Sequence, residues 1–208
     1  MKMTTEPLTI AVPKGYLFEE TIKLFNNIGI TFPSIDDSRK LFTLDSTEKY
    51  KLLKIRPWDV PVYVEQGAAD LGIVGKDVLD EQEPDVLTLK DCHFGGCKLV
   101  IAGQEKCDIA NLKHHSTIAT KYPNATKKYF LKIGKKVNII KLYGAIELGP
   151  LTGICDYICD LTATGATLKE HQLEIVDTVL DSTAHLIANH VGMKVHYKLI
   201  VDLLSSLK

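Results

Sequence analysis

Between residues 147 and 167, carboxylates, hydroxyls and glycines alternate with short apolar runs, and these residue types favour the binding of a phosphorylated sugar. Glu147, Asp156 and Asp160 supply the carboxylates. Asp156 and Asp160 are four residues apart, so they share one face of either a strand or a helix. Beside a phosphate such carboxylates repel the ligand, unless they accept sugar hydroxyls or hold a divalent cation. The grouping therefore indicates a phosphosugar that binds together with Mg²⁺.

A loop of small and hydroxyl-bearing residues follows Asp160 and is the candidate phosphate site. Its members are Thr162, Ala163, Thr164, Gly165, Ala166 and Thr167. The preceding run, 157–161, is typical of a buried strand, and a helical pattern begins at Leu168. Gly165 permits a tight turn, at which backbone N–H groups without intrahelical partners can bind an anion. The alternative for this motif alone is a threonine-capped turn beside two solvated aspartates.

Three cationic side chains are candidates for offsetting phosphate charge. Lys14 lies in a Pro-Lys-Gly turn between an apolar strand at 8–12 and a helix with apolar residues at helical spacing. Arg39 lies in the polar segment 32–50, which is predicted to be a loop or a short hairpin, and Arg56 opens a further helix. An arginine can clamp a phosphate, although exposed loop cations are more commonly only solvated.

Strands alternate with helices along the chain, and the turn with glycine and lysine recurs at 75–76. This order predicts an α/β architecture with a largely parallel sheet, in which ligands bind outside the carboxyl ends of the strands. The polar stretch 103–115 has no clear period and is the expected crossing between two domains. The segment 191–207 is predicted to be a helix that docks onto one of the domains, because its apolar stripe must be covered.

The composition excludes several classes of protein. The 208 residues contain 25 Lys plus Arg and 26 Asp plus Glu without a basic stripe, so nucleic acid is not an expected partner. No segment approaches the roughly 20 apolar residues of a membrane helix, and no leader pattern is present, so we expect a cytoplasmic protein without a membrane span. The five cysteines form no CxxC pair and are expected to be reduced and mostly buried.

Residue types that commonly bind metals are present, but their spacing does not predict a metal site held by the protein. Cys92, His93 and Cys97 lack a fourth ligand, so a buried hairpin is the favoured interpretation of this segment. The seven histidines show no HExxH spacing, and no GxSxG motif marks a nucleophilic serine. A metallohydrolase or a covalent serine mechanism is therefore not predicted.

Several blocks of the chain, in order, carry a resemblance to a known family. The blocks are Ala-Val-Pro-Lys-Gly at 11–15, the run 59–73, Gly-Lys-Asp-Val-Leu at 75–79, Ile-Ala-Thr-Lys-Tyr-Pro-Asn at 118–124, 144–148 and 162–167. Through nearly its whole length, the chain resembles the ATP phosphoribosyltransferases, which catalyse the first step of histidine biosynthesis. Its length is similar to that of the short form of the family, which lacks the regulatory domain of the long form.

The resemblance implies a fold and an assembly. The fold is a two-domain, periplasmic-binding-protein-like (type II) α/β fold with the active site in the cleft between the domains. The expected domain I comprises 1–103 and 190–208, and domain II comprises 104–189 with the phosphoribosyl pyrophosphate loop. The short form implies a hetero-oligomer with a regulatory subunit similar to histidyl-tRNA synthetase.

The resemblance also implies an activity. Phosphoribosyl is transferred from phosphoribosyl pyrophosphate to N1 of ATP, with Mg²⁺ bound to the substrate pyrophosphate. Lys14, Arg39 and Arg56 would offset charge on the leaving pyrophosphate. Substrate binding would fall to Gly15, Glu147, Asp156, Asp160 and the loop 162–167.

One position departs from the family pattern, because Tyr16 stands where the family commonly has an arginine after Lys-Gly. This difference leaves open how the charge of the pyrophosphate is met. The alternative function is a two-domain module that binds a small anion without catalysis, which explains the glycine turns but leaves the carboxylates without a role.

Overall fold

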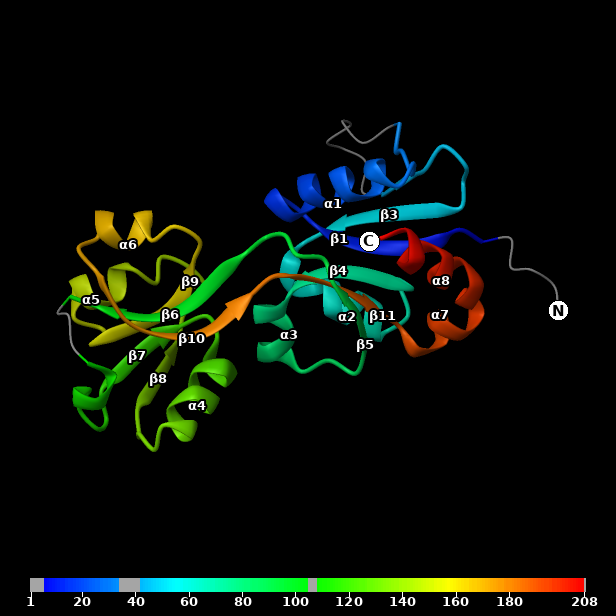
Figure 1. The fold of residues 1–208 in the computed structure, drawn as a ribbon. Coiled ribbons are helices and arrows are strands. Elements are labelled where there is room, and N and C mark those ends of the chain that lie inside the picture. The colour runs from blue at the N-terminus through cyan, green and yellow to red at the C-terminus, as the bar shows by residue number, and fades with distance from the viewer. Residues whose placement is uncertain (1–5, 34–41, 105–107, 208) are drawn as a thin grey trace. The chain divides into compact units, whose positions relative to one another are not determined.

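The computed structural model describes residues 6–33, 42–104 and 108–207, which form two compact units. Unit 1 contains the chain up to Leu79, the segment Glu83–Gly95 and the chain from Thr183 onwards. Unit 2 contains Asp80–Gln82 and Gly96–Ser182. Each unit has its own β-sheet (Figure 1), as a two-domain fold requires.

The sheet of unit 1 is mixed, whereas the sequence predicts a largely parallel one. Its strand order is β2 (Phe42–Leu44), β3 (Tyr50–Ile55), β1 (Leu8–Pro13), β4 (Leu71–Gly75), β11 (Ala184–Ala188) and β5 (Leu87–Asp91). β1 pairs in parallel with β3 and β4. The pairs of β2 with β3, and of β11 with β4 and β5, are antiparallel. The segment 32–50 was predicted to be a loop or a short hairpin, and its strand β2 does form an antiparallel hairpin with β3.

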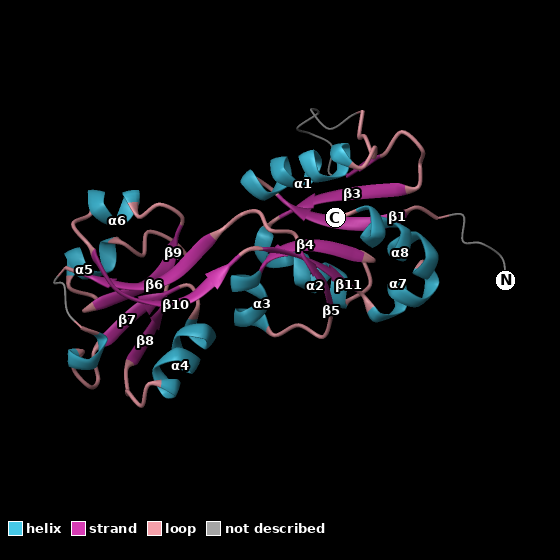
Figure 2. Ribbon diagram, viewed as in Figure 1, coloured by secondary structure: helices cyan, strands magenta, loops and turns pink. Residues whose placement is uncertain are grey.

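Helices lie against the sheet of unit 1 (Figure 2). They are α1 (Tyr16–Asn27), the 3₁₀ turn Pro57–Asp59, α2 (Val60–Glu65), the start of α3 (Lys76–Gln82), α7 (His190–Val195) and α8 (Tyr197–Ser206). Apolar side chains of α1, α2 and α8 lie in the same buried clusters as those of the strands. The predicted terminal helix is thus two helices that meet at His196. The prediction that it docks is confirmed, since Ile200 and Leu203 lie in the same buried cluster as Phe25 of α1 and Ile10 of β1.

The sheet of unit 2 is also mixed. Its strand order is β10 (Glu174–Ser182), β6 (Cys97–Gly103), β9 (Tyr157–Thr162), β7 (Thr117–Thr120) and β8 (Asn138–Lys141). β7 pairs in parallel with β8 and β9, and β6 pairs antiparallel with β9 and β10. The helical segments are the 3₁₀ turn Ile109–Asn111, α4 (Pro123–Lys132), α5 (Leu148–Thr152) and α6 (Ala166–Glu170). The carboxyl ends of β7, β8 and β9 therefore share one edge of this sheet.

The division between the units differs from the expected boundaries at 103 and 190. It falls between Gly95 and Gly96 and between Ser182 and Thr183. β6 belongs to unit 2 because it pairs with β9 and β10, and β11 belongs to unit 1 because it pairs with β4 and β5.

The predicted hairpin around Cys92 and Cys97 is wrong for the same reason. β5 precedes Cys92 and lies in the first sheet, whereas β6 begins at Cys97 and lies in the second.

In the described ranges, no three His, Cys, Asp or Glu side chains are grouped so that they could hold a metal ion. Four cysteines within these ranges are free thiols, namely Cys92, Cys97, Cys155 and Cys159, whereas Cys107 lies outside the described residues. None of the helices described is long and apolar enough to cross a membrane.

Candidate functional site

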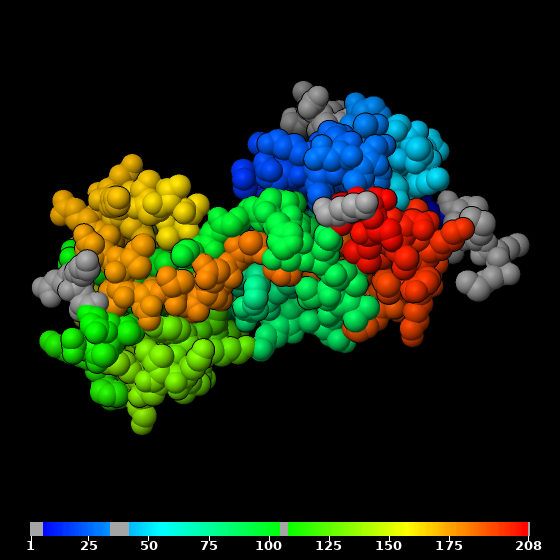
Figure 3. Space-filling model, viewed as in Figure 1, coloured from blue at the N-terminus to red at the C-terminus, as the bar shows by residue number. Residues whose placement is uncertain are grey.

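A cavity of about 310 Å³ in unit 2 gathers most of the predicted phosphate-site residues. Its lining residues are Glu147, Ile158, Asp160, Leu161, Thr162, Ala163, Thr164, Ala166, Thr167 and Leu168. The volume is at the lower end of the range for small-molecule sites. In the space-filling view, the segment around 160–170 (yellow to orange) is at the surface (Figure 3), so a ligand can reach it.

The loop 162–167 has an internal hydrogen-bond pattern that changes the predicted mode of anion binding. Gly165 has a φ of +78° and is the N-cap residue of α6. Its N–H donates to the Thr162 hydroxyl at 2.8 Å, and the N–H of Ala166 donates to the Thr164 hydroxyl at 3.4 Å. These two N–H groups therefore already have partners within the loop, whereas the sequence predicts that they point outward and are free to bind an anion.

The threonine hydroxyls remain able to donate to an anion. A hydroxyl that accepts one hydrogen bond keeps its own hydrogen for a second partner. Thr162 and Thr164 are held by the bonds they accept, and Thr164 and Thr167 are exposed at the cavity. Because α6 spans only five residues, few peptide dipoles add up along it, and the hydroxyls are donors that do not depend on the helix dipole.

Asp160 lies on β9 just before the loop and is half-buried. One carboxylate oxygen accepts the N–H of Leu161 at 2.9 Å. Burial raises the pKa of this carboxyl, the nearby Glu147 carboxylate raises it further, and the Leu161 N–H and the Lys121 ammonium oppose the rise without cancelling it. A carboxylate with remaining acceptor capacity beside a cavity is suited to accept hydroxyl hydrogens from a sugar.

Glu147 is positioned by the close packing of α5 on β9. It is the N-cap residue of α5, but its side chain makes no capping hydrogen bond. Gly149 lets α5 pack closely against the segment that leads into β9, because a Cβ atom there would lie 2.6 Å from the sulfur of Cys155. Glu147 consequently lines the same cavity as Asp160.

Asp156 is separated from Asp160 in the structure. Its carboxylate accepts the N–H of Thr117 at 2.7 Å, where it ties the start of β9 to β7, and it is not among the residues that line the cavity. Asp156 precedes β9 and Asp160 lies within it, and four residues of extended chain span about 13 Å. Asp156 and Asp160 can therefore share a face, as the sequence predicts, while only Asp160 lines the cavity.

In unit 1, two of the three predicted cations are brought together. β1 and β3 pair in register up to Pro13 and Ile55, and Lys14 and Arg56 are the next residue of each strand. The N–H of Lys14 donates to the carbonyl of Ile55 at 2.8 Å, and both cationic side chains are exposed. Arg39 lies outside the described residues.

The turn after Lys14 has the geometry that the sequence predicts. Gly15 has a φ of +88° and is the N-cap residue of α1. Tyr16 begins α1 and is 62% exposed, so the position at which the family commonly has an arginine carries an uncharged side chain at the surface.

Two further lysines, which were not predicted as site residues, occupy places equivalent to that of Lys14. Lys76 follows the last residue of β4, and Lys121 follows the last residue of β7. The signal that could have found them is positional, since each comes directly after the carboxyl end of a parallel strand.

Comparisons with known proteins relate the chain to one family. The sequence model of the family HisG: ATP phosphoribosyltransferase matches residues 56–208. An ATP phosphoribosyltransferase of Geobacter metallireducens is 43% identical over 205 residues, which cover 97% of each chain.

Solved structures show the same relationship. The ATP phosphoribosyl transferase (HisG:HisZ) complex from Thermotoga maritima contains a chain with a TM-score of 0.81 and 33% identity, with 96% of each chain covered. The periplasmic aliphatic sulphonate binding protein SsuA from Escherichia coli, at 15% identity, has a TM-score of 0.63 over 98% of this chain and 72% of its own. The second likeness confirms the periplasmic-binding-protein-like fold alone. The family match and the identity along the whole length show that the chain belongs to the ATP phosphoribosyltransferase family.

Proposed function

We propose that this chain carries out the reaction of its family at the site built around Asp160. N1 of the adenine ring of ATP attacks C1 of phosphoribosyl pyrophosphate, a C–N bond forms, and the bond from C1 to the pyrophosphate oxygen breaks. The products are phosphoribosyl-ATP and pyrophosphate. The observation that carries the proposal is the cavity of unit 2, which combines a hydroxyl-rich loop with two carboxylates in a member of this family.

The loop is assigned to the 5-phosphate of the sugar. The hydroxyls of Thr162 and Thr164 are fixed by the N–H groups of Gly165 and Ala166, so their remaining hydrogens can be donated without further ordering. Thr167 adds a third hydroxyl at the cavity. Binding of the phosphate places C1 for in-line attack. The attack requires no general base, because adenine N1 already has a lone pair.

The carboxylates of Glu147 and Asp160 are assigned to the ribose hydroxyls. Both line the cavity, and the one hydrogen bond that the Asp160 carboxylate accepts comes from the adjacent Leu161 N–H. Asp156 is predicted to bind substrate, but its bond to Thr117 supports a structural role.

Mg²⁺ is proposed to arrive with the pyrophosphate of the substrate. This ion keeps several waters and is commonly held by one or two carboxylates together with substrate phosphates. Two carboxylates at the cavity fit that pattern, whereas the described residues offer no group of three ligands. The bound ion would neutralise charge on the leaving pyrophosphate.

The cations of unit 1 are proposed to offset further charge on the pyrophosphate. Lys14 and Arg56 follow neighbouring strands and are exposed, so both can bind an anion. Arg39 stays a prediction from the family resemblance. Because Tyr16 provides no charge, Lys14 and Arg56 are expected to carry more of this role than in relatives that have the arginine.

We infer that the chain works in the cytoplasm with a regulatory subunit similar to histidyl-tRNA synthetase. The relative from Thermotoga maritima is described as a HisG:HisZ complex, and this chain covers 96% of that chain. A module that only binds a small anion is not favoured, because the relatives with high identity are transferases.

The test is formation of phosphoribosyl-ATP, followed by absorbance, from ATP, phosphoribosyl pyrophosphate and Mg²⁺. The chain is assayed alone and with the synthetase-like subunit, and released pyrophosphate is measured in parallel. We expect both products in equal amounts, with a higher rate when the subunit is present. Binding of phosphoribosyl pyrophosphate without either product, in both assays, would support the anion-binding alternative.

A further inference from the structure

The cavity of unit 2 has an electrostatic imbalance for a phosphate site. Among its lining residues in the described part of the chain, the charged ones are Glu147 and Asp160, and both are acidic. A phosphomonoester carries up to two negative charges near neutral pH, so it is repelled by carboxylates a few ångströms away. Occupation of the loop by a phosphate therefore requires a positive charge nearby.

Lys121 has the position from which such a charge can act. β7 and β9 are parallel neighbours whose last paired residues are Thr120 and Cys159. Lys121 directly follows β7 and Asp160 is the next residue of β9, so this register brings the two residues close together. The Thr120 hydroxyl donates to the carbonyl of Cys159 at 2.7 Å, which fixes this register at the end of β7. The influence of Lys121 on the Asp160 carboxyl, which lowers its pKa, agrees with this closeness.

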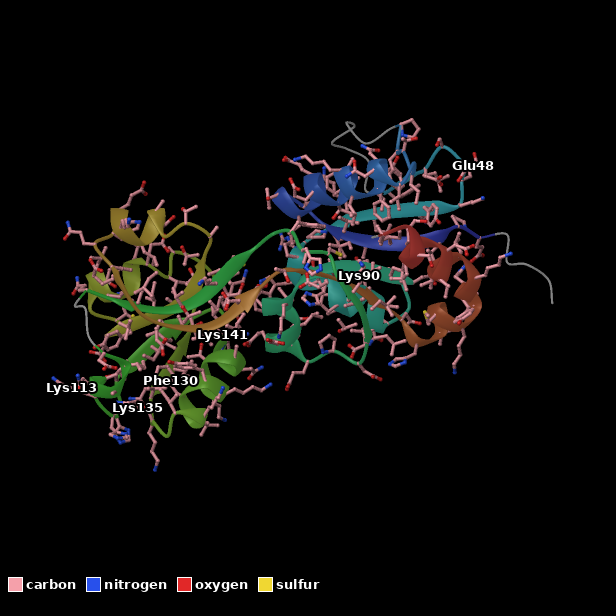
Figure 4. The ribbon with its side chains drawn as sticks, viewed as in Figure 1. Glu48, Lys90, Lys113, Phe130, Lys135 and Lys141 are labelled. Atoms are coloured by element: carbon pink, nitrogen blue, oxygen red, sulfur yellow. The ribbon has the colours of Figure 1, made fainter. Side chains whose placement is uncertain are left out.

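Two other lysines near this edge have contacts that do not involve Asp160. Lys98 is paired with Thr162 across β6 and β9, but its ammonium lies 3.6 Å from the Asp181 carboxylate and is largely exposed. Lys141 ends β8 (Figure 4), and its ammonium lies 5.4 Å from the centre of the Tyr143 ring. The strand register places Lys121 beside Asp160, and the electrostatic influence of Lys121 on Asp160 is consistent with that placement.

We propose that Lys121 is a further positioning residue of the phosphate site, where its ammonium offsets the carboxylates of Glu147 and Asp160 so that a phosphate dianion can occupy the loop 162–167. The inference rests on the proposed function, because it deepens the assignment of that loop to the 5-phosphate. It makes Lys121 part of a charge balance in which removal of the cation is compensated by removal of a carboxylate.

The test measures binding of ribose 5-phosphate and of inorganic phosphate by titration calorimetry. Lys121→Met is expected to weaken binding of both by about tenfold, whereas Lys121→Arg stays within about threefold of wild type. Lys98→Met is the matched control, because it removes a lysine near the same loop. It is expected to change the affinity for either ligand by less than about twofold.

A double-mutant cycle separates charge balance from structural damage. Asp160→Asn is expected to strengthen binding of inorganic phosphate, and Lys121→Met combined with Asp160→Asn to return it close to the wild-type value. A double variant that binds as weakly as Lys121→Met alone, or equal losses in Lys121→Met and Lys98→Met, would overturn the role of Lys121. Failure of the wild type to bind either probe at the loop would instead overturn the phosphate site itself, and this inference with it.

Discussion

Two aspartates that are largely withdrawn from solvent, Asp45 in unit 1 and Asp160 in unit 2, have opposite chemical surroundings. Asp45 is 3% exposed, and its carboxylate accepts hydrogen bonds from the N–H and hydroxyl of Thr47 and from the N–H of Tyr50. Burial alone would raise its pKa, but these donors outweigh burial and lower it. Asp160 accepts a bond from Leu161, faces a second carboxylate, and has a raised pKa.

The difference distinguishes a structural carboxylate from a functional one. The donors around Asp45 close the turn between β2 and β3, and their number leaves little capacity for a ligand. Asp160 retains that capacity beside a cavity, at a cost in stability that a purely structural residue has no reason to carry. Substitution of Asp45 should therefore affect mainly stability, and substitution of Asp160 mainly activity.

The largest effect is expected from Asp160→Asn on turnover. Asparagine removes the charge that accepts the ribose hydroxyls, so kcat/KM for phosphoribosyl pyrophosphate should fall by about 30- to 100-fold. Steady-state kinetics with the regulatory subunit present measure the change. Retention of wild-type kcat/KM would remove Asp160 from the site.

Asp45→Asn is expected to act on stability instead. Loss of bonds to a buried, ionised acceptor should lower the free energy of unfolding by about 2 kcal/mol, or the melting temperature by about 4–8 °C. Calorimetry at neutral pH measures the loss. The KM for phosphoribosyl pyrophosphate should remain that of wild type, and an increased KM would contradict the division of roles.

Thr162→Val and Thr164→Val should each raise the KM for phosphoribosyl pyrophosphate by about tenfold, because each removes a hydroxyl donor to the phosphate. Thr152→Val is a suitable control, since the Thr152 hydroxyl bonds to carbonyls within α5 and does not line the cavity. Equal kinetics in all three variants would show that the loop hydroxyls do not contact the substrate.

The smallest effect is a pair of pH dependences with opposite signs. The raised pKa of Asp160 means that its ionisation destabilises the fold, so Asp160→Asn should melt above wild type at neutral pH, with the gain lost as the pH falls through the raised pKa towards 3.8. The lowered pKa of Asp45 means that its ionisation stabilises the fold. Asp45→Asn should therefore melt below wild type above pH 3.8, and the deficit should disappear as the pH falls through the lowered pKa.

Melting temperatures of both variants from pH 3 to 8 test these signs. The same sign of change for both at neutral pH would mean that the two carboxylates do not differ as described.

Local features of the site could be predicted from the sequence. The loop 162–167 was identifiable because glycine and hydroxyl residues between a strand and a helix are a local signal, and Gly165 does have the positive φ of a turn. Lys14 and Arg56 were identifiable because each follows an apolar strand, and the register of β1 and β3 then brings them together.

Features that depend on pairing between distant strands could not be predicted. A spacing of four residues puts Asp156 and Asp160 on one face in both regular structures, but only the extended form separates them by about 13 Å. The sheet of unit 1 is mixed partly because β11 returns to pair antiparallel with β4 and β5 from roughly 100 residues further along the chain. The sheet of unit 2 is mixed because β6 pairs antiparallel with β9 and β10. Lys121 becomes a neighbour of Asp160 only through the register of β7 and β9.

The most direct test of the central claim is a calorimetric titration of phosphoribosyl pyrophosphate with Mg²⁺ into wild type, Asp160→Asn and Asp156→Asn. Asp156 is the matched control, because it precedes the same strand but bonds to Thr117 and lies outside the cavity lining. We predict that Asp160→Asn weakens binding by at least about tenfold, whereas Asp156→Asn binds as wild type does. Equal affinities of Asp160→Asn and wild type, or a loss confined to Asp156→Asn, would contradict the assignment of the unit 2 cavity as the phosphoribosyl pyrophosphate site.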